Sequence, residues 1–281
     1  MIQNGILLGL VIALLKAIDS IMNKSIMENT SPIHHSIYRI IFVSPFLLLA
    51  ALMNWQIQLD KVWHFVLLYG IIEAVNILFH QKAIKAGNLV FIELLSRSKT
   101  IFALILSFVL VIDTPSPLAV IGILLFTVAT YFTVTKKVES KTGEKTSHLS
   151  LLYEMISVLA RVVKPFLIKG ILTSELVSTE TITFLSMPIS LVCLLAVYRP
   201  KLNFKEINCK KYSLQALIVA AGMLVGVYAV KHANIVTVSA VENFSVFYVI
   251  LYTVIIQKKK YPFWVFIGLA LAIGGLVLAS V

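Results

Sequence analysis

Ten ionisable side chains lie well inside long runs of apolar sequence, where charged residues are rare. A charged side chain at the centre of a lipid-exposed helix costs about 2.5–3.5 kcal/mol on insertion scales. Ten such groups cannot all face lipid, so they must pair with one another or line a water-filled interior. These candidate functional residues are Lys16, Asp19, Arg39, Glu73, Glu93, Arg97, Lys99, Arg161, Lys164 and Glu242.

Helical spacing gathers polar residues into stripes along five of the apolar runs. Residues three, four or seven positions apart lie on one face of an α-helix. The stripes are Lys16, Asp19, Ser20 and Asn23; Tyr69, Glu73, Asn76 and His80; Glu93, Arg97 and Thr100; Glu154, Ser157, Arg161 and Lys164; and Ser239, Glu242 and Asn243. Four other runs, at 33–53, 117–135, 181–198 and 263–281, are nearly free of such stripes. We therefore predict that five helices present polar faces to a shared cavity near the midplane of a membrane.

The charges in these stripes favour an acidic substrate. Cationic side chains outnumber the nearby acids, and the guanidinium fork of arginine matches carboxylate and phosphate groups. A small polar metabolite that carries such a group is therefore the expected ligand. The predicted substrate-binding residues are Lys16, Asp19, Asn76, Glu93, Arg97, Arg161, Lys164, Glu242 and Asn243.

Two glutamates are candidates for coupling transport to protons. Glu73 and Glu242 have no opposite charge on their own helix faces. A carboxylate without a cationic neighbour can exchange a proton in a low-dielectric interior. We assign the proton-coupling role to Glu73, with His80 as its relay neighbour. A buried histidine can equally be a hydrogen-bonded packing residue.

An alternative interpretation is that the charges form internal ion pairs with no substrate role. Glu93 and Arg97 are spaced i, i+4, and Lys16 and Asp19 are spaced i, i+3, so each pair can form within one helix. Arg39 lies nearest a helix end, and we expect its side chain to extend to the membrane interface. The sequence leaves open the choice between structural pairs and substrate binding.

Composition explains why a membrane must surround these helices. Of 281 residues, 59% are hydrophobic and 13% are charged, and the mean hydropathy is +0.95. A soluble domain has nearer one quarter charged residues, so this composition excludes a soluble globule, a disordered chain and a nucleic-acid-binding domain despite the net charge of +11. The ten predicted spans are 5–27, 33–53, 63–82, 89–112, 117–135, 149–171, 181–198, 213–230, 235–256 and 263–281.

Basic residues in the loops predict the orientation. If the loops alternate across the membrane, fifteen lysines and arginines lie on one side and three on the other. The positive-inside rule makes the rich side cytoplasmic. Both termini are then extracytoplasmic, and the expected location is the plasma (inner) membrane, as a multi-pass protein.

The spacing of the glycines and cysteines indicates no further chemical site. Gly5-x3-Gly9 and Gly222-x3-Gly226 have the spacing of closely packed membrane helices, and we interpret both as packing sites. Cys193 and Cys209 form no C-x-x-C motif. We therefore predict no disulfide, no metal site and no cofactor.

The chain contains a weak internal repeat. Ala83-Ile-Lys-Ala-Gly-Asn88 recurs 146 positions later as Ala229-Val-Lys-His-Ala-Asn234. Nearly the same offset relates Lys16 to Arg161, Lys24 to Lys169, and Pro45 to Pro188. Because five spans is an odd number, a second half must be inserted upside down relative to the first. The expected fold is an all-α integral membrane protein of ten transmembrane helices, with a first repeat at 1–138, a basic linker at 139–148 and an inverted second repeat at 149–281.

This organisation resembles the drug/metabolite transporter (DMT) superfamily, EamA type. The resemblance covers nearly the whole chain. In each half an Ala-x-Lys-x-x-Asn motif precedes a long apolar helix, a polar or proline turn and a glycine-bearing helix, with Gly122 in the first half and Gly268, Gly274 and Gly275 in the second. The resemblance implies a transporter with a central cavity lined mainly by the first, third, fourth, sixth, eighth and ninth helices.

The expected function is secondary transport of a small polar, anionic metabolite by alternating access, with proton coupling or exchange. An amphiphile exporter or lipid-carrier flippase is one alternative, and a non-transporting scaffold or receptor is another. An enzyme is not expected, because the chain has no H-E-x-x-H, no G-x-S-x-G and no carboxylate pair at metal spacing. The expected partners are a small-molecule substrate and the lipid bilayer. A homodimer is left open.

Overall fold

The computed structural model describes residues 2–110, 147–204 and 207–258, together with 116–118, 120–122, 124–125, 128, 263, 266–268, 270–271 and 274–275. The predicted spans at 117–135 and 263–281 and the predicted linker at 139–148 lie largely outside these residues. The main described elements are α1 (Ile2–Met27), α2 (Pro32–Met53), α3 (Leu59–Ala86), α4 (Leu89–Ser96), α5 (Lys99–Leu110), α8 (His148–Thr173), α9 (Thr179–Tyr198), α10 (Cys209–His232), α11 (Ile235–Val241), η2 (Glu242–Phe244) and α12 (Ser245–Ile255).

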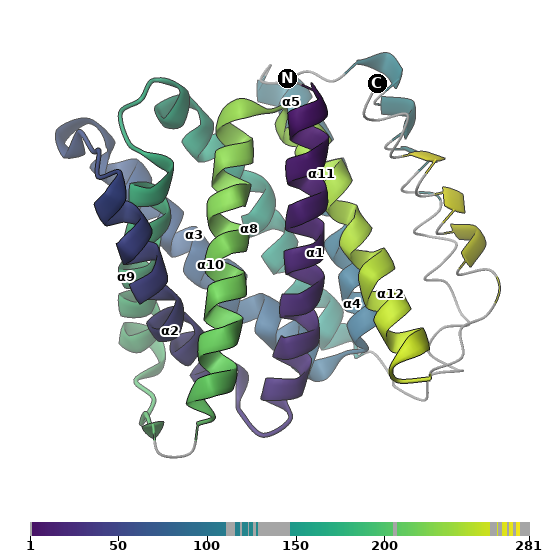
Figure 1. Cartoon of the computed structure of the whole chain (residues 1–281), viewed down its shortest axis with the longest axis horizontal. Helices are drawn as coiled ribbons and strands as arrows, with labels where there is room; N and C mark the ends of the chain where they lie inside the picture. Colours follow the sequence, from purple (N-terminus) through teal and green to yellow (C-terminus); the bar gives the residue numbers. More distant parts are fainter. Residues whose placement is uncertain are drawn as a thin grey trace.

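Long apolar helices dominate the fold. Among the described residues, five stretches are long and apolar enough to cross a membrane, namely α2, α3, α9, α10 and the stretch Ile235–Ile255. The helices α1 and α8, of 26 residues each, carry two of the five polar stripes. Figure 1 shows α10 and α1 running side by side, with α12 inclined beside α1. The predicted spans 5–27, 33–53, 63–82, 149–171, 181–198 and 213–230 are all confirmed as helices.

Several helices begin where the sequence supplies a cap. Ser31, Ser147 and Ser178 precede α2, α8 and α9, and each side-chain oxygen accepts a hydrogen bond from the backbone N–H three residues on. Such caps satisfy N–H groups that have no partner in the first turn of a helix. Pro32 follows the first cap, where its fixed φ suits helix entry. These caps explain why the polar breaks in the sequence separate the spans correctly.

The predicted span 89–112 is interrupted by a turn, whereas the predicted span 235–256 is confirmed as one helical stretch, Ile235–Ile255, that tightens to a 3-10 turn at its middle; both irregular points are called helix breaks below. The first divides into α4 and α5 at Arg97-Ser98, and the second divides into α11, the 3-10 turn η2 and α12. At the first break, Thr100 N donates to Arg97 O at 3.1 Å, so the turn satisfies backbone groups locally. Arg97 Nη1 also donates to Glu242 O at 3.2 Å, so the two breaks are directly connected.

The two broken segments begin in the same way. Asn88 Oδ1 accepts a bond from Phe91 N at 3.1 Å before α4, and Asn234 Oδ1 accepts from Val236 N at 2.9 Å before α11. These are the asparagines of the repeated Ala-x-Lys-x-x-Asn motif. The motif therefore marks the start of a half-helix in each half of the chain.

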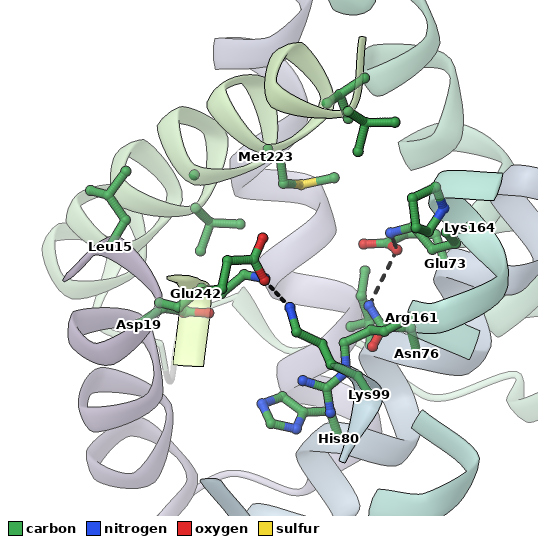
Figure 2. A pocket seen from close by; sticks show the side chains of 18 of the residues that line it. Leu15, Asp19, Glu73, Asn76, His80, Lys99, Arg161, Lys164, Met223 and Glu242 are labelled. Atoms are coloured by element: carbon green, nitrogen blue, oxygen red, sulfur yellow. Dashed lines mark hydrogen bonds and ion pairs between the residues drawn. The ribbon is translucent and has the colours of Figure 1, made fainter. Parts of the chain in front are cut away.

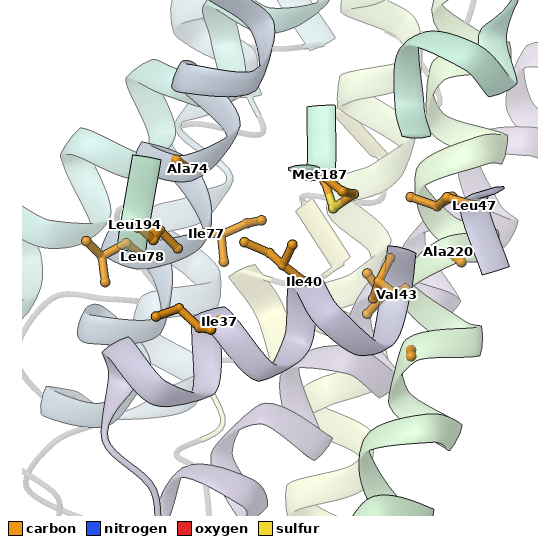
Figure 3. Packing of buried hydrophobic residues seen from close by; sticks show 12 residues of the cluster. Ile37, Ile40, Val43, Leu47, Ala74, Ile77, Leu78, Met187, Leu194 and Ala220 are labelled. Atoms are coloured by element: carbon orange, nitrogen blue, oxygen red, sulfur yellow. The ribbon is translucent and has the colours of Figure 1, made fainter. Parts of the chain in front are cut away.

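Apolar packing joins the two halves. One buried cluster combines α2, α3, α9 and α10, and Figure 3 shows Ile40 and Val43 facing Ile77 and Met187. At one end of the molecule, the connection after α2 meets the connection after α8 through an isolated antiparallel bridge between Ile57 and Val177. The core thus positions polar faces from both halves around one interior space.

Candidate functional site

A cavity of about 220 Å³ lies among the described helices. All ten of the ionisable residues singled out from the sequence line it. They come from α1, α2, α3, α4, α5, α8 and η2, together with Arg97 at the first helix break. Figure 2 shows Glu242 and Asp19 on one side of this space, with Glu73, Lys164 and Arg161 on the other. In the described fold these ten side chains therefore line the same cavity, and their role in substrate binding stays a prediction.

The cavity is framed by ion pairs between helices. Every cation that lines it has an acidic partner within 4 Å. The pairs are Arg39–Asp19, Arg97–Glu93, Arg161–Glu154 and Lys164–Glu73, while Lys16 and Lys99 both contact Glu242. Buried charges require such partners because removal from water is costly. The pair Glu93–Arg97 was predicted from its i, i+4 spacing and is confirmed.

Lys16 and Asp19 do not pair with each other. Asp19 instead receives two hydrogen bonds from Arg39, at 2.6 and 3.0 Å, and a third at 2.9 Å from Gln215 on α10. Lys16 Nζ lies 2.6 Å from Glu242 Oε2. The intrahelical pair was wrong because partners on neighbouring helices offer the bidentate geometry that a lysine one turn away cannot.

Arg39 does not extend to the membrane interface. Its side chain is 13% exposed and is held by Asp19 and Asn23. Asn23 also accepts from Gln215 at 2.6 Å and contacts His35 at 2.8 Å, so a buried polar network joins α1, α2 and α10. The predicted role of Arg39 was wrong because a carboxylate on α1 lies within its reach.

The two predicted proton-coupling residues have separate partners. Glu73 contacts Lys164 on α8 and lies 3.3 Å from Asn76 Nδ2. His80 Nδ1 lies 2.9 Å from Glu154 Oε2, and Glu154 is fully buried. Glu73 therefore has a cationic partner, supplied by a different helix from its own.

Asn243 is the one predicted binding residue that does not line the cavity. It is buried beside the second helix break, where its Nδ2 donates to Thr100 Oγ1 at 3.0 Å. Glu154 was placed on a polar stripe but not among the predicted site residues, although it pairs with Arg161. Lys99 and Tyr69 also line the cavity; the sequence had marked both, as an ionisable residue in an apolar run and as a member of a polar stripe, but not as substrate-binding residues.

The wall formed by α10 is apolar. Its lining residues are Ile218, Val219, Gly222, Met223, Gly226, Val227 and Val230. Gly222-x3-Gly226 is not a close-packing site, because a Cβ at Gly226 would meet nothing within 4 Å and one at Gly222 would make only ordinary contact with Leu15. By contrast, a Cβ at Gly9 would lie 2.6 Å from Val241, so that glycine does permit close helix approach.

The donor set fits an organic ligand better than a metal. Among the described residues, no group of three His, Cys, Asp or Glu side chains is placed to hold a metal ion. The charged side chains that line the cavity are paired into neutral or nearly neutral units. An arrangement of this kind can bind a polar molecule by exchanging one internal ion pair for a contact with the ligand.

Comparison with known proteins finds a similarity to a transporter family over the first part of the chain. Residues 3–135 match the EamA-like transporter family. The match spans just under half of the chain, so this segment is similar to a domain of that family. No curated protein matches the chain.

The fold is shared more widely than the sequence. One protein of known crystal structure superposes with a TM-score of 0.75 at 15% sequence identity, over 98% of this chain and 96% of its own. At that identity the likeness shows the fold alone. Because the alignment extends over both chains almost completely, the shared architecture is not confined to the family domain at residues 3–135.

Proposed function

We propose that the protein is a secondary transporter of a small polar, anionic metabolite. The observation that carries this proposal is the convergence of charged side chains from both halves of the chain on one cavity. Lys16 and Glu73 come from one half and Arg161 and Glu242 from the other. Ionisable groups inside membrane helices are costly and mark substrate or ion pathways.

Alternating access of two inverted halves is the proposed mechanism. The first repeat would occupy 1–138 and the second 149–281, joined by the linker at 139–148. Supporting this arrangement, Lys24 Nζ donates to Gly87 O at 3.0 Å, and Lys169 Nζ donates to Ala233 O at 3.1 Å. Each carbonyl belongs to the residue before a capping asparagine. Broken helices that meet near a central site are a recurrent feature of inverted-repeat transporters.

Energy coupling is proposed to come from a proton gradient or from exchange. Glu73 and His80 are the proposed coupling residues, since both line the cavity. Release of Glu73 from Lys164 would free its carboxylate to take up a proton. Release of Glu154 from His80 would let the imidazole pass that proton to the next acceptor.

The proposed setting follows from the charge of the loops. The basic loops would face the cytoplasm, both termini would be extracytoplasmic, and the membrane would be the plasma (inner) membrane. Assembly as a homodimer is compatible with this topology.

Flux measurements in reconstituted vesicles test the proposal. We expect purified full-length protein to take up small carboxylates or phosphates and to respond to an imposed pH gradient. Uptake of only cations or neutral lipids would overturn the anionic assignment and favour the flippase alternative. The absence of flux for every compound, under every gradient, would favour a scaffold or receptor.

A further inference from the structure

One cation in the cavity has no acid of its own. Six cations line the space, and five acids are available to pair with them when the buried Glu154 is included. Four cations have one carboxylate each, whereas Lys16 and Lys99 contact the same oxygen, Glu242 Oε2. The surplus of one positive charge therefore lies at the Lys16–Lys99–Glu242 cluster. A desolvated surplus charge favours the binding of a single opposite charge.

Lys16 is the cation that a ligand can reach. Its side chain is 38% exposed, whereas those of the other five cations are at most 16% exposed. Lys99, at 8% exposed, is held inside the cluster. An anion can thus contact Lys16 while Lys99 stays with Glu242.

The α10 wall of the cavity is suited to an apolar group. The α10 wall defined above presents aliphatic side chains and two glycines one turn apart, with open space above Gly226. The wall begins beside the cluster, since a Cβ at Gly222 would lie 3.6 Å from Cβ of Leu15, the neighbour of Lys16. Figure 2 shows Met223 above Glu242, with Lys99 below it in this view. Acid-binding and apolar surfaces are therefore adjacent.

A separate observation concerns a buried amide group at the cavity. Gln81 lines the cavity and is 1% exposed, yet its Oε1 has no hydrogen-bond partner among the described residues. A buried amide oxygen without a donor is costly. A donor group on a bound molecule, such as a hydroxyl, would satisfy it.

We propose that the cavity selects monoanionic organic acids with an apolar body. This inference rests on the proposed transport function and names the substrate class. The acid group lies at Lys16, drawn away from Glu242, with Lys99 adding a second positive charge. The apolar body lies along the α10 wall over Gly222 and Gly226. The acid group and the apolar body of the ligand therefore contact different surfaces of the same cavity.

Calorimetric binding to the detergent-purified full chain tests the charge half of the proposal. The probes are 4-methylpentanoate, acetate and succinate, which are respectively a monoanion with an apolar body, a monoanion without one, and a dianion. We expect 4-methylpentanoate to bind at least about tenfold more tightly than either of the others. Equal affinities, or a preference for succinate, would overturn the proposal.

The variant Glu242→Gln makes the charge test specific. It raises the surplus from one positive charge to two, so the ratio of succinate to 4-methylpentanoate affinity should rise by about tenfold or more. If that ratio does not change in folded Glu242→Gln protein, the cluster does not hold the acid group. Should this variant fail to fold, the glycine variants below still decide the proposal.

Gly226→Leu tests the apolar half. Leucine is a good helix former and meets open space here, so the fold should be retained. We expect affinity for 4-methylpentanoate to fall by about tenfold or more and affinity for acetate to change little. The matched control is Gly170→Leu on α8, which also meets nothing within 4 Å but does not line the cavity, and it should bind like the original chain. Equal losses in both variants, or no loss in Gly226→Leu, would contradict the proposal.

The same protein preparations separate this inference from the proposed function. Vesicle flux of some other anion, together with weak 4-methylpentanoate binding, would rule out the proposed substrate class but would support the proposed transport function. Tight 4-methylpentanoate binding without flux of any compound would rule out the proposed transport function but would support the proposed binding site.

Discussion

Lys16 and Arg161, which are 145 positions apart, make equivalent contacts at the two helix breaks. Lys16 Nζ lies 2.6 Å from Glu242 Oε2, and Arg161 Nη1 lies 2.6 Å from Ser96 Oγ. Glu242 and Ser96 are themselves separated by 146 positions, and each lies where its segment is interrupted. The relation pairs a cation from one half with the broken helix of the other. Movement of one half against the other must therefore change both contacts.

Arg161→Lys tests whether this contact matters for transport. The guanidinium reaches both Ser96 and the buried Glu154, whereas a lysine ammonium keeps the charge but loses the planar fork. We expect vesicle flux to fall by about tenfold or more while thermal stability changes little. Unchanged flux in Arg161→Lys would show that only the charge is needed.

Asp19→Asn should destabilise the fold strongly. It leaves Arg39 partly buried without its carboxylate, and breaking a buried pair by removing one partner costs about 3–5 kcal/mol. The double variant Asp19→Asn with Arg39→Gln should recover part of that loss, as read from thermal unfolding of the detergent-purified protein. A single variant as stable as the original chain would mean that the pair contributes little.

Lys169→Met should loosen the entry to α11. The ammonium donates to Ala233 O, and a hydrogen bond that involves a charged group contributes about 1.5–3 kcal/mol. Both Lys169→Met and Lys24→Met should therefore lower the unfolding temperature, and by similar amounts. In the other half, Lys24→Met removes the corresponding bonds to Ile84 O and Gly87 O. Very different effects of the two variants would argue against equivalent roles.

Glu73→Gln should abolish the response of transport to a pH gradient. The amide cannot exchange a proton, and it leaves Lys164 without its carboxylate. Flux should be compared in vesicles with and without an imposed gradient, using substrate exchange as the control for an intact site. If pH-driven transport persists in Glu73→Gln, the coupling residue lies elsewhere.

Much of the architecture could be predicted from the sequence because hydropathy and caps act locally. Ser31-Pro32 ends one apolar run and starts the next helix, and Asn88 and Asn234 start half-helices. The breaks after Ser96 and at Glu242 could not be predicted, since no proline or glycine occurs at either. They are stabilised by contacts between segments distant in sequence, such as the bond from Arg97 to the Glu242 carbonyl.

The sequence predicted which residues lie at the candidate site, but not which of them form ion pairs with one another. Burial cost alone identified the ten ionisable residues, because each is unfavourable in lipid wherever its partner lies. Periodicity correctly paired Glu93 with Arg97 and placed Glu154 and Arg161 on one stripe. It could not pair Asp19 with Arg39 or Glu73 with Lys164, because those contacts depend on how separate helices pack.

Thiol accessibility tests most directly the central claim that these polar faces surround one water-filled interior. Single cysteines at Asn76, Met223 and Leu217 would be introduced after replacement of Cys193 and Cys209, the two free cysteines. Asn76 and Met223 line the cavity, whereas Leu217 lies on the same helix as Met223 and is 52% exposed on the outer surface. A charged, membrane-impermeant thiol reagent should label positions 76 and 223 in membrane vesicles and leave position 217 unlabelled. Labelling at 217, with positions 76 and 223 inert from both sides of the membrane, would contradict the account.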